Sequence, residues 1–178
     1  MYKKILSTNS GMWGIWDYET YKHIDEYDKW DKLFCEDEDI IKQIKNKTFI
    51  PAYIFQDGSC SFTVKIDEEL NEREEKYVCV KSEPYLLKTS GKVVVSGIEH
   101  IDKKLNDTNT IIINLPSGEY SVKIFLLSWD EEPGAYLENG EVNPNALSDF
   151  VIIIQSNANS DMQYREKINT FFKRLILN

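Results

Sequence analysis

Four consecutive acids behind a cysteine form the densest group of chemically active side chains in the sequence. The stretch LFCEDEDII, residues 33–41, could be a metal site, a patch that imitates a polyanion, or the first turn of a helix. A calcium loop of the EF-hand kind needs alternating acids and a glycine at its sixth position, but the sixth residue from Asp37 is Lys42. Because the helix dipole favours acids in the first turn, we favour a helix that begins at these acids. The four residues are Glu36, Asp37, Glu38 and Asp39.

Neither of the two histidines has the neighbours that a metal site or a general base requires. His23 precedes two aspartates in HIDEYD, and His100 stands between Glu99 and Asp102. A zinc site needs three or four convergent ligands, and no predicted helix carries two histidines four residues apart. We interpret both histidines as surface or strand-end residues and expect no bound metal.

The motifs of nucleophilic catalysis and of phosphate binding are absent from the sequence. It contains no GxSxG elbow and no glycine-rich loop of the P-loop or dinucleotide kind. A glycosidase needs two carboxylates, but thirty acids make some pair inevitable, so that signal carries no information. We therefore predict no catalytic residue and no cofactor, and we interpret the chain as a protein that is not an enzyme.

The three cysteines, Cys35, Cys60 and Cys79, favour a reducing compartment, since an odd number would leave an unpaired thiol in a secreted protein. Cys60 and Cys79 fall on predicted strand faces with apolar companions, so we expect both to be buried and inert. No apolar run of roughly seven residues follows the first lysines, and none approaches the roughly 18 residues of a membrane span. These patterns predict a cytoplasmic protein.

Composition and charge narrow the classes of partner. Hydrophobic residues make up 42% of the chain and charged residues 29%, which is typical of a globular protein with a substantial core. The formal net charge is −9 and the isoelectric point is about 4.8. A negative surface repels nucleic-acid phosphates and anionic lipid, so we expect no direct nucleic-acid partner and no membrane partner. A basic protein partner, in contrast, would be attracted by this negative surface.

One long connection, residues 130–149, contains six acids and no lysine or arginine. It is either a solvated acidic loop or a docking surface for a basic protein, because acidic rims steer basic partners and aromatic anchors make hot spots. We select the 129–138 part as the first candidate surface and the four acids at 36–39 as the second. The first set is Trp129, Asp130, Glu131, Glu132, Tyr136 and Glu138.

Helical patterns lie at both ends of the chain. Residues 36–46 begin with acids, carry isoleucines on one face and end with lysines, which predicts a helix. Residues 21–34 place apolar residues near helical spacing and predict either a short helix or a curled loop, whereas residues 1–21 look aromatic and irregular. Residues 162–177 carry an apolar face that predicts a C-terminal helix, capped by Ser160 or Asp161.

The middle of the chain has the patterns of β-strands. Residues 59–66 alternate in polarity, and residues 150–155, FVIIIQ, are apolar enough for a central strand buried on both faces. Residues 109–116 and 118–130 flank a PSG turn, which predicts a hairpin. Further strands are predicted within 49–55, 77–88 and 92–101, with residues 67–76 as a charged connection.

We therefore predict a mainly β protein, an antiparallel β-sandwich with short N-terminal helices and a C-terminal helix. It should form a single domain over residues 1–178. Within it we expect an aromatic and acidic N-terminal region at 1–46, a β-sandwich core at 47–156 and a C-terminal helix at 161–177.

Two stretches of the middle half resemble the bacterial DNA-entry nuclease inhibitor (competence protein J) family and related toxin-associated domains. They are EPYLLKTSGKVVVSGI, residues 83–98, and the run NLPSGEY, residues 114–120. The shared motifs are a turn and two strands, so they specify fold better than activity. The resemblance implies a small β-rich inhibitor that occludes a nuclease.

Two classes of function remain open from the sequence. The first is a non-enzymatic inhibitor or immunity-type protein that binds a basic partner, such as a nuclease or toxin. The alternative is a carbohydrate- or calcium-binding β-sandwich module, because four tryptophans and ten tyrosines offer aromatic surface for a sugar. The sequence leaves the oligomeric state, the strand order and the convergence of the acidic segments open.

Overall fold

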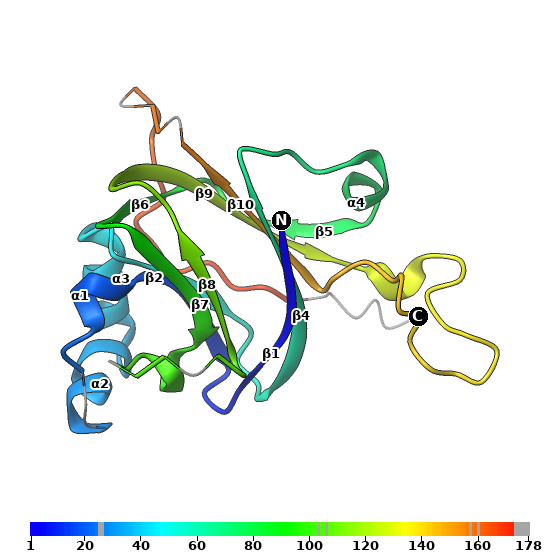
Figure 1. The fold of residues 1–178 in the computed structure, drawn as a ribbon, viewed down its shortest axis with the longest axis horizontal. Helices are drawn as coiled ribbons and strands as arrows, with labels where there is room; N and C mark the ends of the chain where they lie inside the picture. Colours follow the sequence, from blue (N-terminus) through cyan, green and yellow to red (C-terminus); the bar gives the residue numbers. More distant parts are fainter. Residues whose placement is uncertain (25–26, 103, 106, 157, 160, 173–178) are drawn as a thin grey trace.

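The computed structural model describes residues 1–24, 27–102, 104–105, 107–156, 158–159 and 161–172. Within these residues ten strands form two sheets, and the short helices between residues 18 and 45 gather at one end of the molecule (Figure 1). The strands are β1 Tyr2–Thr8, β2 Met12–Asp17, β3 Phe49–Tyr53, β4 Gly58–Ile66, β5 Val78–Lys81, β6 Tyr85–Thr89, β7 Lys92–Gly97, β8 Thr110–Asn114, β9 Gly118–Leu127 and β10 Phe150–Gln155. The α-helices are α1 Tyr18–Tyr21, α2 Tyr27–Phe34, α3 Asp37–Lys45 and α4 Glu72–Lys76.

The larger sheet has the strand order β1-β4-β10-β9-β5, with β6 also paired to β9, and the smaller sheet has the order β3-β2-β7-β8. The strand at 150–155 is central, between β4 and β9, and five of its six residues are buried, as the sequence predicted. One pair departs from the predicted antiparallel arrangement: β10 runs parallel to β4, with Phe150 opposite Phe62. The remaining ladders are antiparallel, so the mainly β prediction is confirmed.

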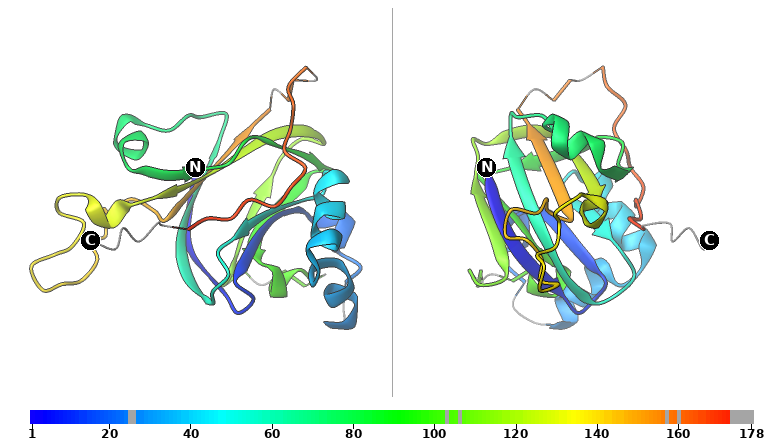
Figure 2. Two further views of the ribbon diagram at one scale, coloured as in Figure 1. Left: turned by 180° about the vertical axis from the view of Figure 1, so that it is seen from behind. Right: turned by 90° about the vertical axis from the view of Figure 1, so that its right-hand side faces the viewer.

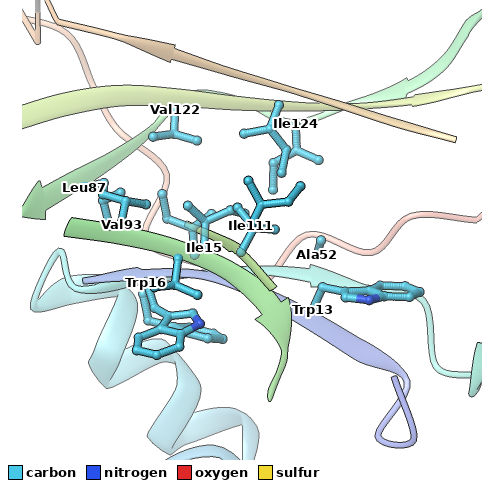
Figure 3. Close-up of a cluster of buried hydrophobic side chains, with 14 of the residues drawn as sticks. Trp13, Ile15, Trp16, Ala52, Leu87, Val93, Ile111, Val122 and Ile124 are labelled. Atoms are coloured by element: carbon cyan, nitrogen blue, oxygen red, sulfur yellow. The ribbon is translucent and has the colours of Figure 1, made fainter. Parts of the chain in front are cut away.

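The core lies between the two sheets. Val122 and Ile124 of β9 face Ile15 of β2 and Ile111 of β8 across the sandwich (Figure 3). Each fully buried side chain of this kind contributes about 1.5–3 kcal/mol relative to leaving it exposed. Gly14 lies on the opposite, helix-covered face of β2, where a Cβ would lie 2.2 Å from the Phe49 ring. The buried side chains of both sheets and of the helices form one continuous apolar cluster.

The N-terminal region is part of the sandwich, which corrects the expectation that residues 1–21 are irregular and separate from it. The first strand, β1, is an edge strand of the larger sheet, and β2 is an interior strand of the smaller sheet. All six residues of β2 are buried, including Trp13 and Trp16. A strand that is buried on both faces lacks polar alternation, so period-2 reasoning did not identify it. Of the two alternatives for residues 21–34, the structure has a short helix, α2, over Tyr27–Phe34, and the predicted helix at 36–46 is confirmed as α3.

The predicted hairpin at the PSG turn is wrong. The first of its strands, β8, pairs with β7 in the smaller sheet, whereas β9 pairs with β10 in the larger sheet. Leu115 donates its backbone N–H to the carbonyl of Gly91, so the turn carries the chain from one sheet to the other. A turn signal defines a change of direction, but it does not state which neighbour each strand will pair with.

The predicted C-terminal helix is also wrong over the described residues 161–172, which are extended and contain no helix. We call residues 161–172 the C-terminal strap; residues 173–177 of the predicted helix lie outside the described part. The strap runs across the molecule between the two sheets (Figure 2). The backbone N–H of Phe171 donates to Tyr53 of β3, and Phe171 is buried against Phe150. Burial of Phe171, with Ile168 packed partly buried on the core, outweighs local helix propensity.

Candidate functional site

The acidic connection forms a compact loop at one end of the long axis (Figure 1). It begins with a short 3-10 turn, Trp129–Glu131, and ends at Asp149 next to β10. The Trp129 indole donates its Nε1–H to Asp149 Oδ1 at 2.7 Å, and the Trp129 and Tyr136 rings lie 5.5 Å apart. These contacts join the two ends of the loop to its centre, so the loop has a defined shape without regular secondary structure.

Hydrogen bonds within the loop build a small ribbon that projects from the sandwich. The N–H of Leu137 donates to the carbonyl of Glu141 at 2.8 Å, and the N–H of Gly140 donates back to Leu137 at 2.9 Å. Gly140 adopts a positive φ of 83°, which favours glycine at this turn. The ribbon leaves large apolar side chains exposed to solvent at its tip: Tyr136, Leu137 and Val142, each with 41–52% of its surface accessible.

The acids of the loop differ in their surroundings. The carboxylate of Glu132 accepts two hydrogen bonds from Arg73, at 2.6 and 2.7 Å. The Arg73 guanidinium therefore holds the pKa of Glu132 below its usual range. The candidate acids Asp130, Glu131 and Glu138 are exposed. The structure thus separates Glu132 and Asp149, which order the loop, from Glu131 and Glu138, which are exposed.

A second acidic segment, residues 67–76, lies beside this loop (Figure 2). Arg73 joins the two segments, because it also donates to the backbone carbonyl of Asn145 at 2.8 Å. The exposed acids of this segment are Asp67, Glu68, Glu69, Glu72 and Glu75. We name residues 67–76 and 129–149 together the acidic end. Sequence reasoning noted the charge of 67–76 but did not include it among the candidate site residues.

A buried ion pair holds residues 67–76 against the outer face of the larger sheet. Lys65 of β4 and Glu74 of α4 lie 2.5 Å apart, with only 5% and 7% of their side chains accessible. Glu74 also accepts the N–H of Asn71, whose side chain caps α4 in return. Leu70 packs on the small outer cluster around Leu127 and Ile153. The position of Arg73, and through it of the loop, therefore depends on this pair.

The second candidate set, Glu36 to Asp39, forms the N-terminus of α3, as the dipole argument predicted. Helix α3 lies at the end of the long axis opposite to the acidic loop (Figure 1). The two candidate sets therefore do not converge on one surface. Beside them, the Cys35 thiol donates to Asp31 at 2.6 Å, which raises the pKa of Cys35 and keeps the thiol protonated at neutral pH.

The other two cysteines differ from the expectation that both are buried. Cys79 is exposed, and Cys60 is half-buried. Burial raises the pKa of the Cys60 thiol to about 12, so this group is a poor nucleophile at neutral pH. Cys79 is accessible because it lies on the edge strand β5, whereas Cys60 lies near the start of β4 and packs partly buried against the core.

His100 belongs to a polar network that links the segment between β7 and β8 to the β1–β2 turn. Its Nε2 lies 2.5 Å from the Asn109 amide nitrogen, and Glu99 accepts hydrogen bonds from Asn9 and Ser10 in the β1–β2 turn. His23 is exposed. Within the part of the chain that the structure describes, no group of three or more His, Cys, Asp or Glu side chains is placed to hold a metal ion.

The described helices include none that is both long and apolar enough to cross a membrane.

Comparison with known proteins identifies the fold. No family model and no curated protein matches the sequence. Among solved structures, ComJ from Bacillus subtilis, described as an inhibitor of the DNA degrading activity of NucA, matches 88% of this chain and 96% of its own. The TM-score is 0.51 and the sequence identity 9%. The product of crocagin biosynthetic gene J matches 89% of this chain and 100% of its own, with a TM-score of 0.55 and 12% identity.

The structural likeness extends well beyond the middle half of the chain that carries the sequence resemblance. It includes most of the chain in both comparisons, although few residues are identical. At such low identity the agreement lies in the arrangement of the strands rather than in particular side chains. The chain shares its fold with ComJ and with the crocagin biosynthetic protein.

Proposed function

We propose that this protein is a non-enzymatic inhibitor or immunity-type protein of the cytoplasm that binds a basic protein partner, a nuclease or nuclease toxin. Its fold supports this proposal, because ComJ, which has a similar fold, is described as inhibiting a DNA-degrading activity. The cysteines support a reducing compartment, since all three are free.

The observation that carries the proposal is an acidic loop with an exposed apolar tip, whose base is joined through Arg73 to a second acidic segment. A nuclease cleft is basic because it must hold phosphates, and an acidic surface competes for the same charges. Acidic side chains around the rim raise the association rate, and a desolvated aromatic at the centre supplies affinity. At the acidic end, Tyr136 is the exposed aromatic, and Glu131 and Glu138 are rim acids.

Each candidate residue has a role in this proposal. Asp130, Glu131 and Glu138 would contact the partner's basic side chains, and Tyr136 would enter its surface. Trp129 and Glu132 would hold the loop in shape, since both are engaged within the fold. The acids at 36–39 would form a separate, weaker surface, because they lie at the opposite end of the molecule.

The first experiment is a pull-down from the native host, in low and high salt, with mass spectrometry of the bound proteins. We expect a basic nuclease that is retained at low salt and lost at high salt, because exposed charges are screened. The same experiment with Glu131→Lys/Glu138→Lys should lose that partner. The matched control is Glu36→Lys/Glu38→Lys, which makes the same charge change at the other end and should retain it.

Addition of the purified protein to the captured nuclease should then reduce DNA cleavage, and the Glu131→Lys/Glu138→Lys variant should leave cleavage unchanged. Equal inhibition by both proteins would remove the acidic end from the proposed interface. A complete absence of any protein partner in both salt conditions would contradict the inhibitor proposal itself.

A second candidate function is carbohydrate binding, which one specific observation favours. Tyr53, Phe55 and Phe172 form an aromatic stack, with ring centroids 3.8 and 5.3 Å apart, and both phenylalanines are more than half exposed. Phe55 has a positive φ of 60°, which is rare for a bulky residue and marks a backbone held by its surroundings. Retention on an insoluble polysaccharide that Phe55→Ala abolishes would support this function over the inhibitor.

A further inference from the structure

A groove lined by cations lies away from the acidic end. Its volume is about 1160 Å³, and its walls come from the end of α3, the β5–β6 connection, β9 and the C-terminal strap. Two of its cations have partners: Arg165 pairs with Glu83 at 2.7 Å, and Lys47 pairs with Glu119 at 2.9 Å. Within the described residues, four further lysines line the groove with no carboxylate at ion-pair distance: Lys45, Lys81, Lys123 and Lys167.

The charge of this groove is opposite to that of the molecule. Six lysine and arginine side chains line it, against the two acids Glu83 and Glu166, in a chain whose net charge is −9. Like charges held together without partners repel one another, so the arrangement is favourable when an anion occupies the groove. Helix α3 and β6 lie at the end of the long axis opposite to the loop of the acidic end (Figure 1).

The C-terminal strap forms one wall of the groove and is held in place by hydrogen bonds. The N–H of Arg165 donates to the carbonyl of Pro84 at 2.8 Å, and its guanidinium donates to the carbonyls of Lys167 and Ile168. The hydroxyl of Tyr85 donates to the carbonyl of Lys167 at 2.7 Å. These bonds fix residues 165–168 beside β6, so the position of Lys167 does not depend on a ligand.

The groove also contains apolar surface between its cations. Ile44 of α3, Leu86 of β6 and Met162 of the strap all line it. Single-stranded nucleic acid is bound on successive aromatic platforms, whereas Tyr164 is the one aromatic residue among those that line this groove. A polynucleotide would also meet the negative field of the rest of the molecule. A small anion needs far less room, since small-molecule pockets commonly occupy about 300–1,000 Å³.

We propose that this basic groove binds an extended acidic polypeptide segment of another protein, with carboxylates on the lysines and apolar side chains against Ile44, Leu86 and Met162. Charge complementarity selects the acids, and the apolar surface selects a peptide in which they alternate with hydrophobic residues. This surface is distinct from the acidic end, so the protein would have two docking surfaces of opposite sign.

The test is a fluorescence anisotropy titration of the full chain with a labelled ten-residue peptide of alternating Glu and Leu. We expect saturable binding that weakens at least tenfold when both Lys81 and Lys123 are changed to Glu. The control, Lys32→Glu/Lys104→Glu, makes the same charge change at two exposed lysines that do not line the groove, and it should bind like the unmodified protein. Circular dichroism checks that both variants are folded.

Three outcomes would overturn the proposal: no binding of the Glu/Leu peptide, equal weakening by both variants, or tighter binding of a labelled ten-nucleotide single strand than of the peptide. Sedimentation velocity tests one further occupant, the acidic loop of a second copy. Self-association that is lost in both Lys81→Glu/Lys123→Glu and Glu131→Lys/Glu138→Lys would assign the groove to that copy instead. Peptide binding that survives Glu131→Lys/Glu138→Lys separates this inference from the proposed function.

Discussion

At the scale of single residues, the buried polar groups are placed to stabilise the fold. The Asp17 carboxylate accepts hydrogen bonds from Thr20, Thr89 and the backbone of Ser90, at 2.7–2.9 Å. This single carboxylate therefore both caps α1 and holds the β6–β7 turn. Tyr85 has a comparable role at the strap, where its buried hydroxyl donates to Lys167.

Tyr85 predicts how stability changes at alkaline pH. Burial raises the pKa of Tyr85 to about 12, whereas a tyrosine of the unfolded chain ionises near 10. A raised folded-state pKa contributes stability that is fully present below about pH 10 and is lost as pH rises through about 12. We expect Tyr85→Phe to reduce the fall in unfolding free energy over this window, measured by urea denaturation at a series of pH values.

The control for this measurement is Tyr2→Phe, at a tyrosine that is more than one-third exposed. An unchanged alkaline slope in Tyr85→Phe would show that the Tyr85 hydroxyl is not the group that titrates.

At the scale of elements, two irregular segments complete the sandwich and position the candidate surfaces. The segment that contains α4 lies on the outer face of the larger sheet and carries Arg73 to the acidic loop. The strap lies between β3 and β6 and forms a wall of the basic groove. Each is held by a few buried contacts, so single substitutions should release it.

Lys65→Met tests the first of these segments. It leaves the carboxylate of Glu74 buried without its partner, which costs about 3–5 kcal/mol of unfolding free energy. The double variant Lys65→Met/Glu74→Leu removes both charges and should recover most of the loss. Chemical denaturation of both proteins measures this, and equal destabilisation of the two would show that packing, not charge, is responsible.

Phe171→Ala tests the strap against a neighbouring control. Phe171 is 2% exposed and packs on Phe150, so its truncation should cost about 3–5 kcal/mol. Phe172, the next residue, is 51% exposed, and Phe172→Ala should change stability by about 0.5 kcal/mol. In the extended strap only Phe171 of this pair is buried, so similar unfolding free energies for the two variants would contradict the course of the strap.

At the scale of the whole molecule, the two sheets share one apolar core, and charge of opposite sign gathers at separate surfaces. Residues from β1 to the strap contribute to the same buried cluster. The acidic end and the basic groove use this core as a common support.

The shared core predicts that the chain unfolds as one cooperative unit, in accord with the expected single domain. Trp13 packs on Phe62 of the larger sheet and Trp16 packs on Tyr21 of α1, so tryptophan fluorescence reports on both faces of the smaller sheet. Urea transitions followed by tryptophan fluorescence and by far-ultraviolet circular dichroism should coincide. Two separate midpoints would show that parts of the chain fold independently.

Local patterns in the sequence were sufficient for several elements. Acids followed by isoleucines and lysines specified α3, and the continuous apolar run of β10 specified a central strand, because each pattern reflects the periodicity of its own backbone. The negative charge of the 130–149 connection likewise followed directly from the sequence. These features depend on neighbours within a few residues, so no knowledge of distant contacts was needed.

Long-range contacts decided the rest. Residues 115–117 do not reveal that β8 and β9 belong to different sheets, and the apolar spacing of 162–172 does not reveal an extended strap. Arg73 and Glu132 are 59 residues apart, and only the packing of α4 on the larger sheet brings them together. Sequence by itself determined the class of elements and the signs of their charges, since these are local properties. The tertiary structure alone decided which charged segments meet, because burial and pairing depend on partners far along the chain.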